Sequence, residues 1–211
     1  MAKKEQKIMM IKQSPKLSAE TRRSQILNAA HKLFEKKGYR ATTIDDIAEN
    51  AGLTKGAVYY HFKNKESILK YMVKCALDGW IDAFNKIPNG SLSPGQLLYK
   101  VREADYNIPM HKASHNLSVI FEIMQIPNIR KMVNEGYGFV VEACMKCLDA
   151  RYVKSKSQRK QLAILVLLFY DGLCWAKNFE YSQFEFNKQA GLFASLFVPV
   201  KEKILEKGKS S

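Results

Sequence analysis

The sequence predicts an all-α protein of about nine helices, and three observations lead to this fold class. Apolar residues recur at intervals of three and four through most of the chain, which is the period of an amphipathic helix. Residues that cap helices and glycines that end them separate these segments. No stretch of useful length alternates apolar and polar residues as a half-buried strand does, and no internal repeat occurs.

Composition favours a folded, basic protein with an anionic partner. The 211 residues are 46% hydrophobic and 11% aromatic, which is enough apolar material for a core. The formal net charge is +14, a balance typical of proteins that bind nucleic acid and, less often, anionic membrane. Residues 1–70 carry 15 Lys and Arg against 7 Asp and Glu, whereas the other 141 residues carry 19 against 13. We therefore expect the anion-binding end to be N-terminal.

Few segments lie outside the helical pattern. Residues 1–18 are polar and basic and are predicted to form a flexible arm along nucleic acid, or a terminus without a role. The apolar patch Ile8–Ile11 is too short for a secretory signal, and the apolar run at 162–170 is half the length of a membrane span. Four cysteines do not make a disulfide framework in a chain of this length, so we expect a reducing, cytoplasmic setting.

The N-terminal third predicts three helices in succession. The first begins at Thr21 and has its apolar residues on one face. Thr43 can cap a short second helix with Asp46 at its third position, and Gly52 supplies a left-handed residue after it. Thr54 can cap a third helix after this short turn. Two short helices joined by a glycine-containing turn form a helix-turn-helix.

The rest of the chain predicts longer helices. Asn64 can cap a fourth helix at 65–86, and the following sequence IPNGSLSPG indicates a connecting loop. Further helices are expected at 94–107, 110–125, 127–151, 157–181 and 184–206. The predicted parts are a basic arm at 1–18, a helix-turn-helix domain at 19–66 and a helical domain at 67–211.

The third helix has an unusual surface. At 100° per residue, Lys55, Gly56, Tyr59 and Tyr60 share one arc, and Val58 lies roughly opposite, toward neighbouring helices. Glycine lets a backbone come close to DNA, and the N–H groups at a helix start favour a phosphate. Tyrosine offers a ring to thymine methyl groups and a hydroxyl to phosphate oxygens. This arc favours the major groove of DNA, although an ordinary surface helix would show similar residues.

The span from Thr21 to Lys70 resembles the DNA-binding domain of the tetracycline-repressor (TetR) family. The matching elements are LF at 33–34, GY at 38–39, TT at 42–43, IA at 47–48, AG at 51–52 and KGAVYYHFKNKE at 55–66. Members of the family are homodimeric transcription regulators, and most are repressors that a small ligand releases from DNA. The resemblance implies the same role here.

The resemblance also implies which residues touch DNA. Thr42 or Thr43 would meet a phosphate at the start of the second helix. Independently of the resemblance, the charges of Lys63 and Lys65 at the start of the fourth helix can add phosphate contacts. Thr54, Lys55, Gly56 and Tyr59 would face the groove, with Tyr60, His61 and Lys65 on the DNA backbone. The helical period turns His61 away from Lys55, whereas the resemblance places it on a phosphate. We expect the position that the resemblance implies.

The family's second domain varies widely, and its general plan is a helical ligand-binding domain whose last two helices pair in a homodimer. Segments 162–179 and 190–198 are suitable for that interface, since the first is apolar beyond one stripe and the second sets small residues between large ones. YDGL at 170–173 is similar to a segment often found in the family's penultimate helix. A two-fold dimer would place two recognition helices about one DNA turn apart, as a palindromic operator requires.

A ligand pocket is expected among the middle helices. Met and aromatic side chains suit a roomy apolar pocket, which indicates a hydrophobic or aromatic effector, although a helical core buries similar residues. The candidate lining residues are Trp80, Phe84, Tyr106, Met110, Phe121, Met124, Tyr137, Val141, Phe169 and Trp175.

Three smaller groups of residues allow other chemistry. They are His111 and His115 at metal-ligand spacing with Asp105 or Glu103 as a conceivable third ligand, the mid-helix pair Cys144 and Cys147, and the possible anion partners Arg102 and Arg130. We expect surface, packing and solvated roles for them, and no metal or cofactor.

The chain has no phosphate loop, dinucleotide-binding glycine pattern or nucleophile elbow, so an enzyme is not predicted. A basic membrane-binding helical protein is a further rival.

The prediction is a ligand-responsive, sequence-specific transcription regulator, most simply a repressor that leaves a palindromic operator when an effector binds. A DNA-binding activator, or a regulator without a small-molecule ligand, is the alternative. In the mechanism we expect, ligand bound among the central helices shifts the helix at 65–86 and changes the separation of the recognition helices.

Overall fold

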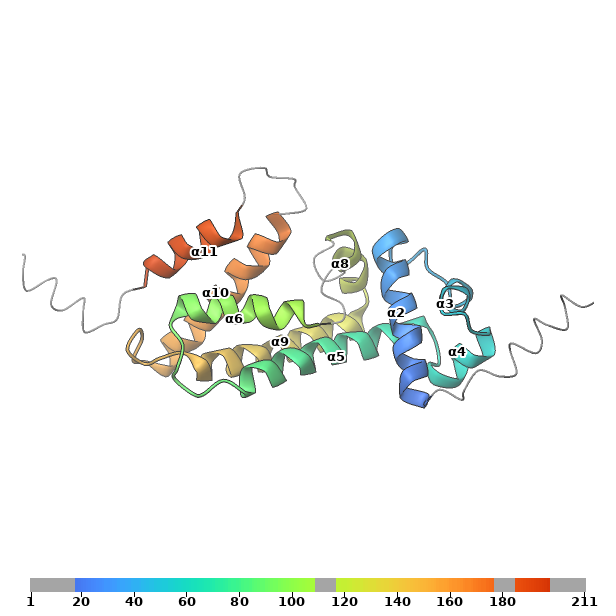
Figure 1. Ribbon diagram of the computed structural model, residues 1–211, viewed down its shortest axis with the longest axis horizontal. Helices are drawn as coiled ribbons and strands as arrows, with labels where there is room; N and C mark the ends of the chain where they lie inside the picture. The colour runs from blue at the N-terminus through green and yellow to red at the C-terminus, as the bar shows by residue number, and fades with distance from the viewer. Residues whose placement is uncertain (1–17, 109–116, 177–184, 198–211) are drawn as a thin grey trace, which may run out of the picture. The chain divides into compact units, whose positions relative to one another are not determined.

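The computed structural model describes residues 18–108, 117–176 and 185–197, coloured in Figure 1. These residues form nine α-helices and no strand, apart from one isolated bridge between Leu92 and Leu148. The helices are α2 (Ala19–Lys37), α3 (Ile44–Asn50), α4 (Lys55–His61), α5 (Lys65–Asn85), α6 (Pro94–Tyr106), α8 (Leu117–Met124), α9 (Pro127–Cys147), α10 (Lys156–Ala176) and α11 (Phe186–Ser195). The all-α prediction of about nine helices is confirmed.

The chain divides into two compact units, Met1–Ile68 and Leu69–Ser211. In the first unit α2 packs on α3 and α4, and α3 packs on α4. Buried side chains from the three helices meet there, among them Ile26 and Phe34 of α2, Ile47 of α3 and Val58 of α4. This core holds the two short helices in one arrangement, which neither could keep alone because helices of seven residues are unstable in isolation.

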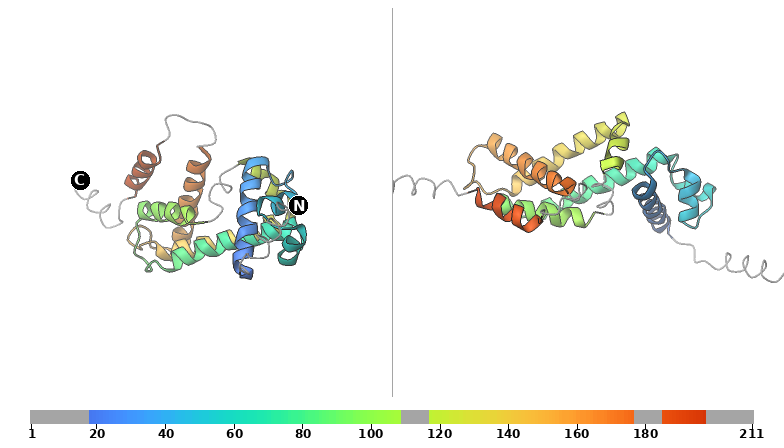
Figure 2. Two further views of the ribbon diagram at one scale, coloured as in Figure 1. Left: turned by 45° about the vertical axis from the view of Figure 1, so that its right-hand side comes forward. Right: turned by 90° about the horizontal axis from the view of Figure 1, so that it is seen from above.

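The second unit is a helical bundle around one apolar core. Helix α10 packs on α6 and α9, α8 packs on α9, and α11 packs on α6. In the right-hand view of Figure 2 the red α11 lies next to the green α6. Gly95 of α6 and Ala194 of α11 are in such close contact that a methyl group on the glycine would overlap the alanine side chain. None of the helices in the described ranges has the length and apolar character that crossing a bilayer requires.

Helix α9 ends earlier than predicted. The expected segment was 127–151, but the helix stops at Cys147 and Leu148 is extended, with φ −71° and ψ 129°. The loop before α6 takes over the hydrogen bonds there, because Leu92 N–H donates to Cys147 O at 2.9 Å and Asp149 N–H donates to Leu92 O at 2.9 Å. A contact between residues far apart in the chain therefore sets this boundary.

The other predicted bounds differ less. Helix α10 begins at Lys156, one residue before the predicted start, and α11 runs over Phe186–Ser195 within the predicted 184–206. Helix α8 covers 117–124 of the predicted 110–125. The predicted arm at 1–18, apart from Ser18, lies outside the described residues. So do residues 110–116, 177–181, 184 and 198–206 of the predicted helices.

Candidate nucleic-acid interface

The first turn of α3 is held by a reciprocal cap. The Thr43 side chain accepts from Asp46 N–H at 3.1 Å, and Asp46 Oδ2 accepts from Thr43 N–H at 2.7 Å. Lys37, at the end of α2, pairs with the same carboxylate at 2.7 Å. Its hydrogen bond, with those from Thr43, lowers the pKa of Asp46 well below the usual range. The predicted capping box is therefore present, and the pairing of Asp46 with Lys37 ties the start of α3 to α2.

The turn between α3 and α4 has the predicted chemistry. Gly52 has φ +64°, a conformation that glycine adopts without strain, and Leu53 N–H donates to Ala48 O at 2.8 Å. Gln25 of α2 reaches across and donates through Nε2 to Ala51 O at 2.6 Å. Thr54 then caps α4 by accepting from Ala57 N–H at 3.2 Å. The turn is therefore braced on both sides, and α4 starts at a defined angle.

Helix α4 has one buried side and one exposed side. Val58 is fully buried, which confirms the prediction that it anchors the helix. Tyr59 and Tyr60 are 47% and 85% exposed, and Lys55 and Gly56 are exposed beside them. The exposed part of an aromatic side chain gains nothing from burial in the folded chain. The arc of Lys55, Gly56, Tyr59 and Tyr60, called here the α4 face, is thus available to a partner.

Lys55 has a neighbour that sequence reasoning missed. Its ammonium lies 2.9 Å from a carboxylate oxygen of Asp45 in the first turn of α3, and this contact raises the pKa of Lys55. Both side chains are more than half exposed, so the pair contributes little stability. No local sequence pattern signals the pair, since the two residues are ten positions apart on different helices.

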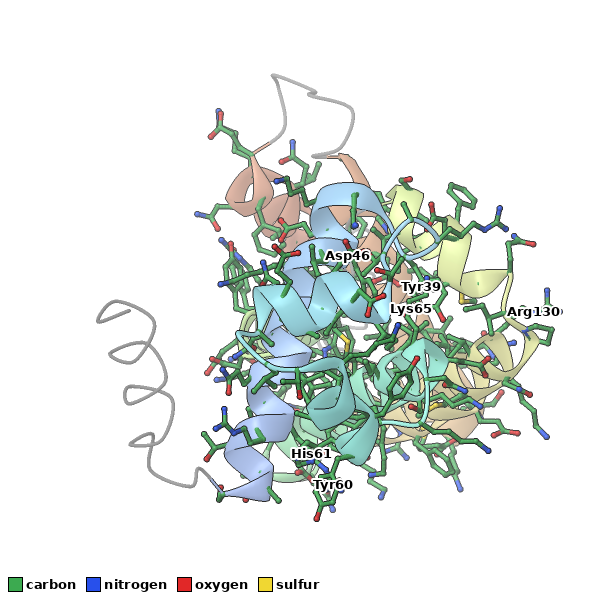
Figure 3. All side chains as sticks on the ribbon, turned by 90° about the vertical axis from the view of Figure 1, so that its right-hand side faces the viewer. Tyr39, Asp46, Tyr60, His61, Lys65 and Arg130 are labelled. Carbon is green, nitrogen blue, oxygen red and sulfur yellow. The ribbon has the colours of Figure 1, made fainter. Side chains whose placement is uncertain are left out.

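His61 lies at the C-terminal end of α4. It is half-buried, and its ring meets the Tyr60 ring edge-on with the centroids 5.0 Å apart. Figure 3 shows the two labelled side chains together, well away from Tyr39 and Lys65. The contact of His61 with DNA stays a prediction.

Two residues of the predicted DNA-binding set are occupied inside the unit. Thr42 is 1% exposed, and its hydroxyl donates to Gly38 O at 2.8 Å. Its side chain cannot meet a phosphate, so this expectation is corrected and Thr43 is the member of the pair at the surface. Lys65 is half-buried, and its ammonium donates to three backbone carbonyls of the α2–α3 connection.

The predicted ligand-binding residues fall into three groups. Phe84 and Val141 belong to the core of the second unit, and Trp80, Tyr137 and Phe169 pack against it. Met124 is half-buried, whereas Tyr106, Phe121 and Trp175 are exposed. Met110 lies outside the described residues. The fold thus gathers five of the ten around one core, and their role as ligand contacts stays a prediction.

Two tyrosine–carboxylate pairs lie within this mainly apolar bundle. Tyr137 of α9 donates to Asp171 Oδ2 at 2.8 Å, and Tyr170 donates to Asp105 Oδ2 at 2.8 Å. Burial raises the pKa of Asp171 to about 6. Burial also raises the pKa of both tyrosines, so their hydroxyls stay protonated and act as donors. Asp105 was predicted only as a conceivable metal ligand, but its partner in the structure is Tyr170 from another helix.

The cysteine pair and the two arginines that allowed other chemistry lie within the described residues. Burial raises the pKa of the Cys144 and Cys147 thiols, so both are protonated at neutral pH and poor nucleophiles. Arg102 lies over the Phe186 ring, 4.2 Å from its centroid, and Arg130 is exposed. His111 and His115 lie outside the described residues. Within the described ranges, no three His, Cys, Asp or Glu side chains are grouped as a metal site would need.

Comparison with known proteins agrees with this geometry. Residues 26–72 match the family model described as "Bacterial regulatory proteins, tetR family". The transcriptional repressor KstR2 of Mycolicibacterium smegmatis is 31% identical over 102 residues, which cover 48% of this chain and 49% of the relative. This chain therefore spans about half the length of such a relative. The regulator AcrR of Shigella flexneri is 23% identical over 194 residues, 87% of this chain and 90% of AcrR.

A solved structure extends the likeness to the fold. The SmeT–triclosan complex superposes with a TM-score of 0.63 at 21% identity, covering 85% of this chain and 93% of SmeT. At that identity the match concerns the fold alone. KstR2 is a transcriptional repressor and AcrR is a transcriptional regulator. From the family model and these relatives, with the helix-turn-helix of α3 and α4 in place, residues 26–72 form the N-terminal domain of the tetR family of bacterial regulatory proteins.

Proposed function

We propose that the chain is a sequence-specific transcription regulator that binds double-stranded DNA through the α4 face. One observation supports this most directly: a glycine, two exposed tyrosines and a lysine lie on the outer side of a short helix whose inner side is fixed by Val58. The backbone can approach base edges beside Gly56, and the aromatic rings can contact thymine methyl groups. Thr43, Thr54, Lys55, Gly56 and Tyr59 then face DNA, with Tyr60 and His61 on its backbone.

Binding by a homodimer follows from the apolar surface of the last two helices. Leu165, Leu168 and Trp175 of α10 are exposed at the spacing of one helical face, and Leu192 and Leu196, at and just after the C-terminal end of α11, are exposed as well. Such a surface in water favours association with a second apolar surface. A two-fold pair would present two α4 faces to a palindromic operator.

A small hydrophobic or aromatic effector of the second unit completes the proposal. Trp80, Phe84, Tyr137, Val141 and Phe169 supply aromatic and apolar surface around one core. The structural relative SmeT was solved with triclosan, so a chain of this fold holds a small organic molecule. In this proposal the effector releases the regulator from its operator, and the regulator is a repressor.

The experiment is a binding titration with a duplex selected by the wild-type chain from random DNA. Tyr59→Ala and Lys55→Ala each weaken binding by about 1–3 kcal/mol where the lost contact is to a base. Glu185→Ala, an exposed change in the second unit, is the matched control and leaves affinity unchanged. Full affinity in both α4 variants removes this face from the interface. Equal binding of scrambled duplex and anionic vesicles favours a basic membrane-binding protein instead.

A further inference from the structure

Lys65 uses its whole hydrogen-bonding capacity inside the first unit. Its Nζ donates to the carbonyl oxygens of Tyr39 at 2.6 Å, Arg40 at 3.1 Å and Thr42 at 2.6 Å. A lysine ammonium has three N–H donors and no acceptor. Three convergent carbonyls therefore leave no donor for a phosphate, although Lys65 stands at a position where the family resemblance implies a contact with the DNA backbone.

The three carbonyls belong to the connection between α2 and α3. This connection turns through Gly38, at φ +84°, and within it Thr42 N–H donates to Tyr39 O at 3.3 Å and the Thr42 hydroxyl donates to Gly38 O. The Tyr39 ring packs edge-on against Phe34 of α2, and the Lys65 ammonium lies 4.4 Å from its centroid. Figure 3 shows Lys65 beside Tyr39. The lysine therefore joins both the backbone and the aromatic side chain of the connection to the first turn of α5.

The connection leads directly to the DNA-facing end of α3. Thr42, whose carbonyl accepts from Lys65, precedes Thr43, whose side chain caps α3. Because Thr42 is buried and bonded at both its carbonyl and its hydroxyl, the position of Thr43 depends on these contacts. We propose that Lys65 is a positioning residue that holds the α2–α3 connection and the N-terminus of α3 in the DNA-binding arrangement, and that it does not contact DNA itself. This proposal rests on the proposed DNA-binding function.

A direct contact between Lys65 and a DNA phosphate would cost hydrogen bonds, and this cost supports the positioning role. To reach a phosphate, the ammonium would leave three carbonyl oxygens, two of them partly buried, and hydrogen bonds to charged groups are stronger than neutral ones. Lys63 lies two residues earlier and is exposed, so it can pair with a phosphate without such a loss. Lys63 is therefore the matched control.

Three variants of the full chain test the proposal. Lys65→Met keeps the length of the side chain and removes all three donors. Lys65→Arg keeps the charge but places the donors in a plane, so it suits a phosphate and cannot converge on three carbonyls. Lys63→Met removes the exposed charge. Amide exchange at Thr42, Thr43 and Asp46 is measured by NMR in the free protein, and affinity for the selected duplex is measured as a function of salt.

We expect both Lys65 variants to accelerate exchange at these amides by about tenfold or more, since a charged hydrogen bond is lost. Affinity falls in both, while the salt slope keeps its wild-type value. Lys63→Met leaves exchange unchanged and lowers the slope by about 0.9, the value for one phosphate contact. The proposal is overturned if Lys65→Met keeps the wild-type amide exchange rates, or if the salt slope of its DNA affinity falls by about one. It is also overturned if Lys65→Arg keeps both the wild-type exchange rates and the wild-type affinity. Should the wild type bind no duplex selectively, the proposed function fails, and the exchange measurement still tests the role of Lys65.

Discussion

Adding one methyl group to Gly56 separates the stability of the protein from its affinity for DNA. A Cβ built on this glycine would have Thr54 Oγ1 at 4.0 Å as its nearest neighbour, so the folded chain accommodates an alanine without a clash. Gly56 is in helix α4, and alanine restricts the unfolded chain more than glycine does. Gly56→Ala is therefore expected to raise the free energy of unfolding by about 0.5–1 kcal/mol.

The same methyl group should weaken DNA binding. In the proposed complex the α4 backbone at Gly56 lies against the groove, where an extra carbon occupies space that the duplex needs. Overfilling a packed contact costs about 1–3 kcal/mol, and affinity then falls by about 5- to 150-fold. The two effects have opposite signs, so lower affinity cannot be attributed to unfolding.

The measurements are thermal unfolding of the free protein and fluorescence anisotropy with the selected duplex at one salt concentration. Gly138→Ala in α9 is the matched control, because this glycine is exposed, helical and has no atom within 4 Å of the added carbon. It should raise stability equally and leave affinity unchanged. Wild-type affinity in Gly56→Ala would refute the close approach of the α4 backbone to DNA, and reduced stability would refute the free space at Cβ.

Three further predictions concern the second unit. Gly95→Ala should lower stability by about 1–3 kcal/mol, because the new methyl group overlaps the Ala194 side chain of α11 and lies 3.2 Å from its backbone. Thermal unfolding checks this, with Gly138→Ala as the control, and an unchanged unfolding midpoint would contradict it. The raised pKa of Asp171, about 6 against 3.8, means that the folded state keeps the proton, so stability falls by up to about 3 kcal/mol as pH rises from about 4 to 6. Asp171→Asn should remove this pH dependence and be more stable than the wild type at pH 7. Urea titrations at several pH values measure the free energy of unfolding of both proteins, and the same pH dependence in both would contradict the role of Asp171. Replacing Leu165 and Leu168 together by Glu should give a monomer with reduced operator affinity, and a dimer in light scattering would place the interface elsewhere.

Helix α4 was predictable from the sequence because the signals that start and end it are local. The cap at Thr43, the left-handed Gly52 and the cap at Thr54 act over three or four residues, so spacing alone identifies them. Val58 follows from the helical period for the same reason. The residues on the α4 face were therefore predictable, although their contact with DNA awaits the titrations above.

Predictions from the sequence were wrong where contacts between distant segments set the burial of a side chain or the end of a helix. Thr42 and Thr43 are equivalent in the sequence, and only the packing of the α2–α3 connection buries the first and exposes the second. The helix predicted to reach residue 151 stops at Cys147, because the loop at Leu92 takes its hydrogen bonds. Neither contact leaves a periodic or local signal.

By itself, the sequence determined the helical class, the capped helix-turn-helix and the resemblance to a regulator family, since these depend on neighbours along the chain. The tertiary structure alone decided which polar groups are occupied. Lys65 meets carbonyls 23 to 26 residues away, Lys55 meets Asp45 across a turn, and Asp171 meets a tyrosine on another helix. Charge and hydrogen-bonding capacity are properties of a residue, but whether they remain available to a partner depends on what folding brings beside them.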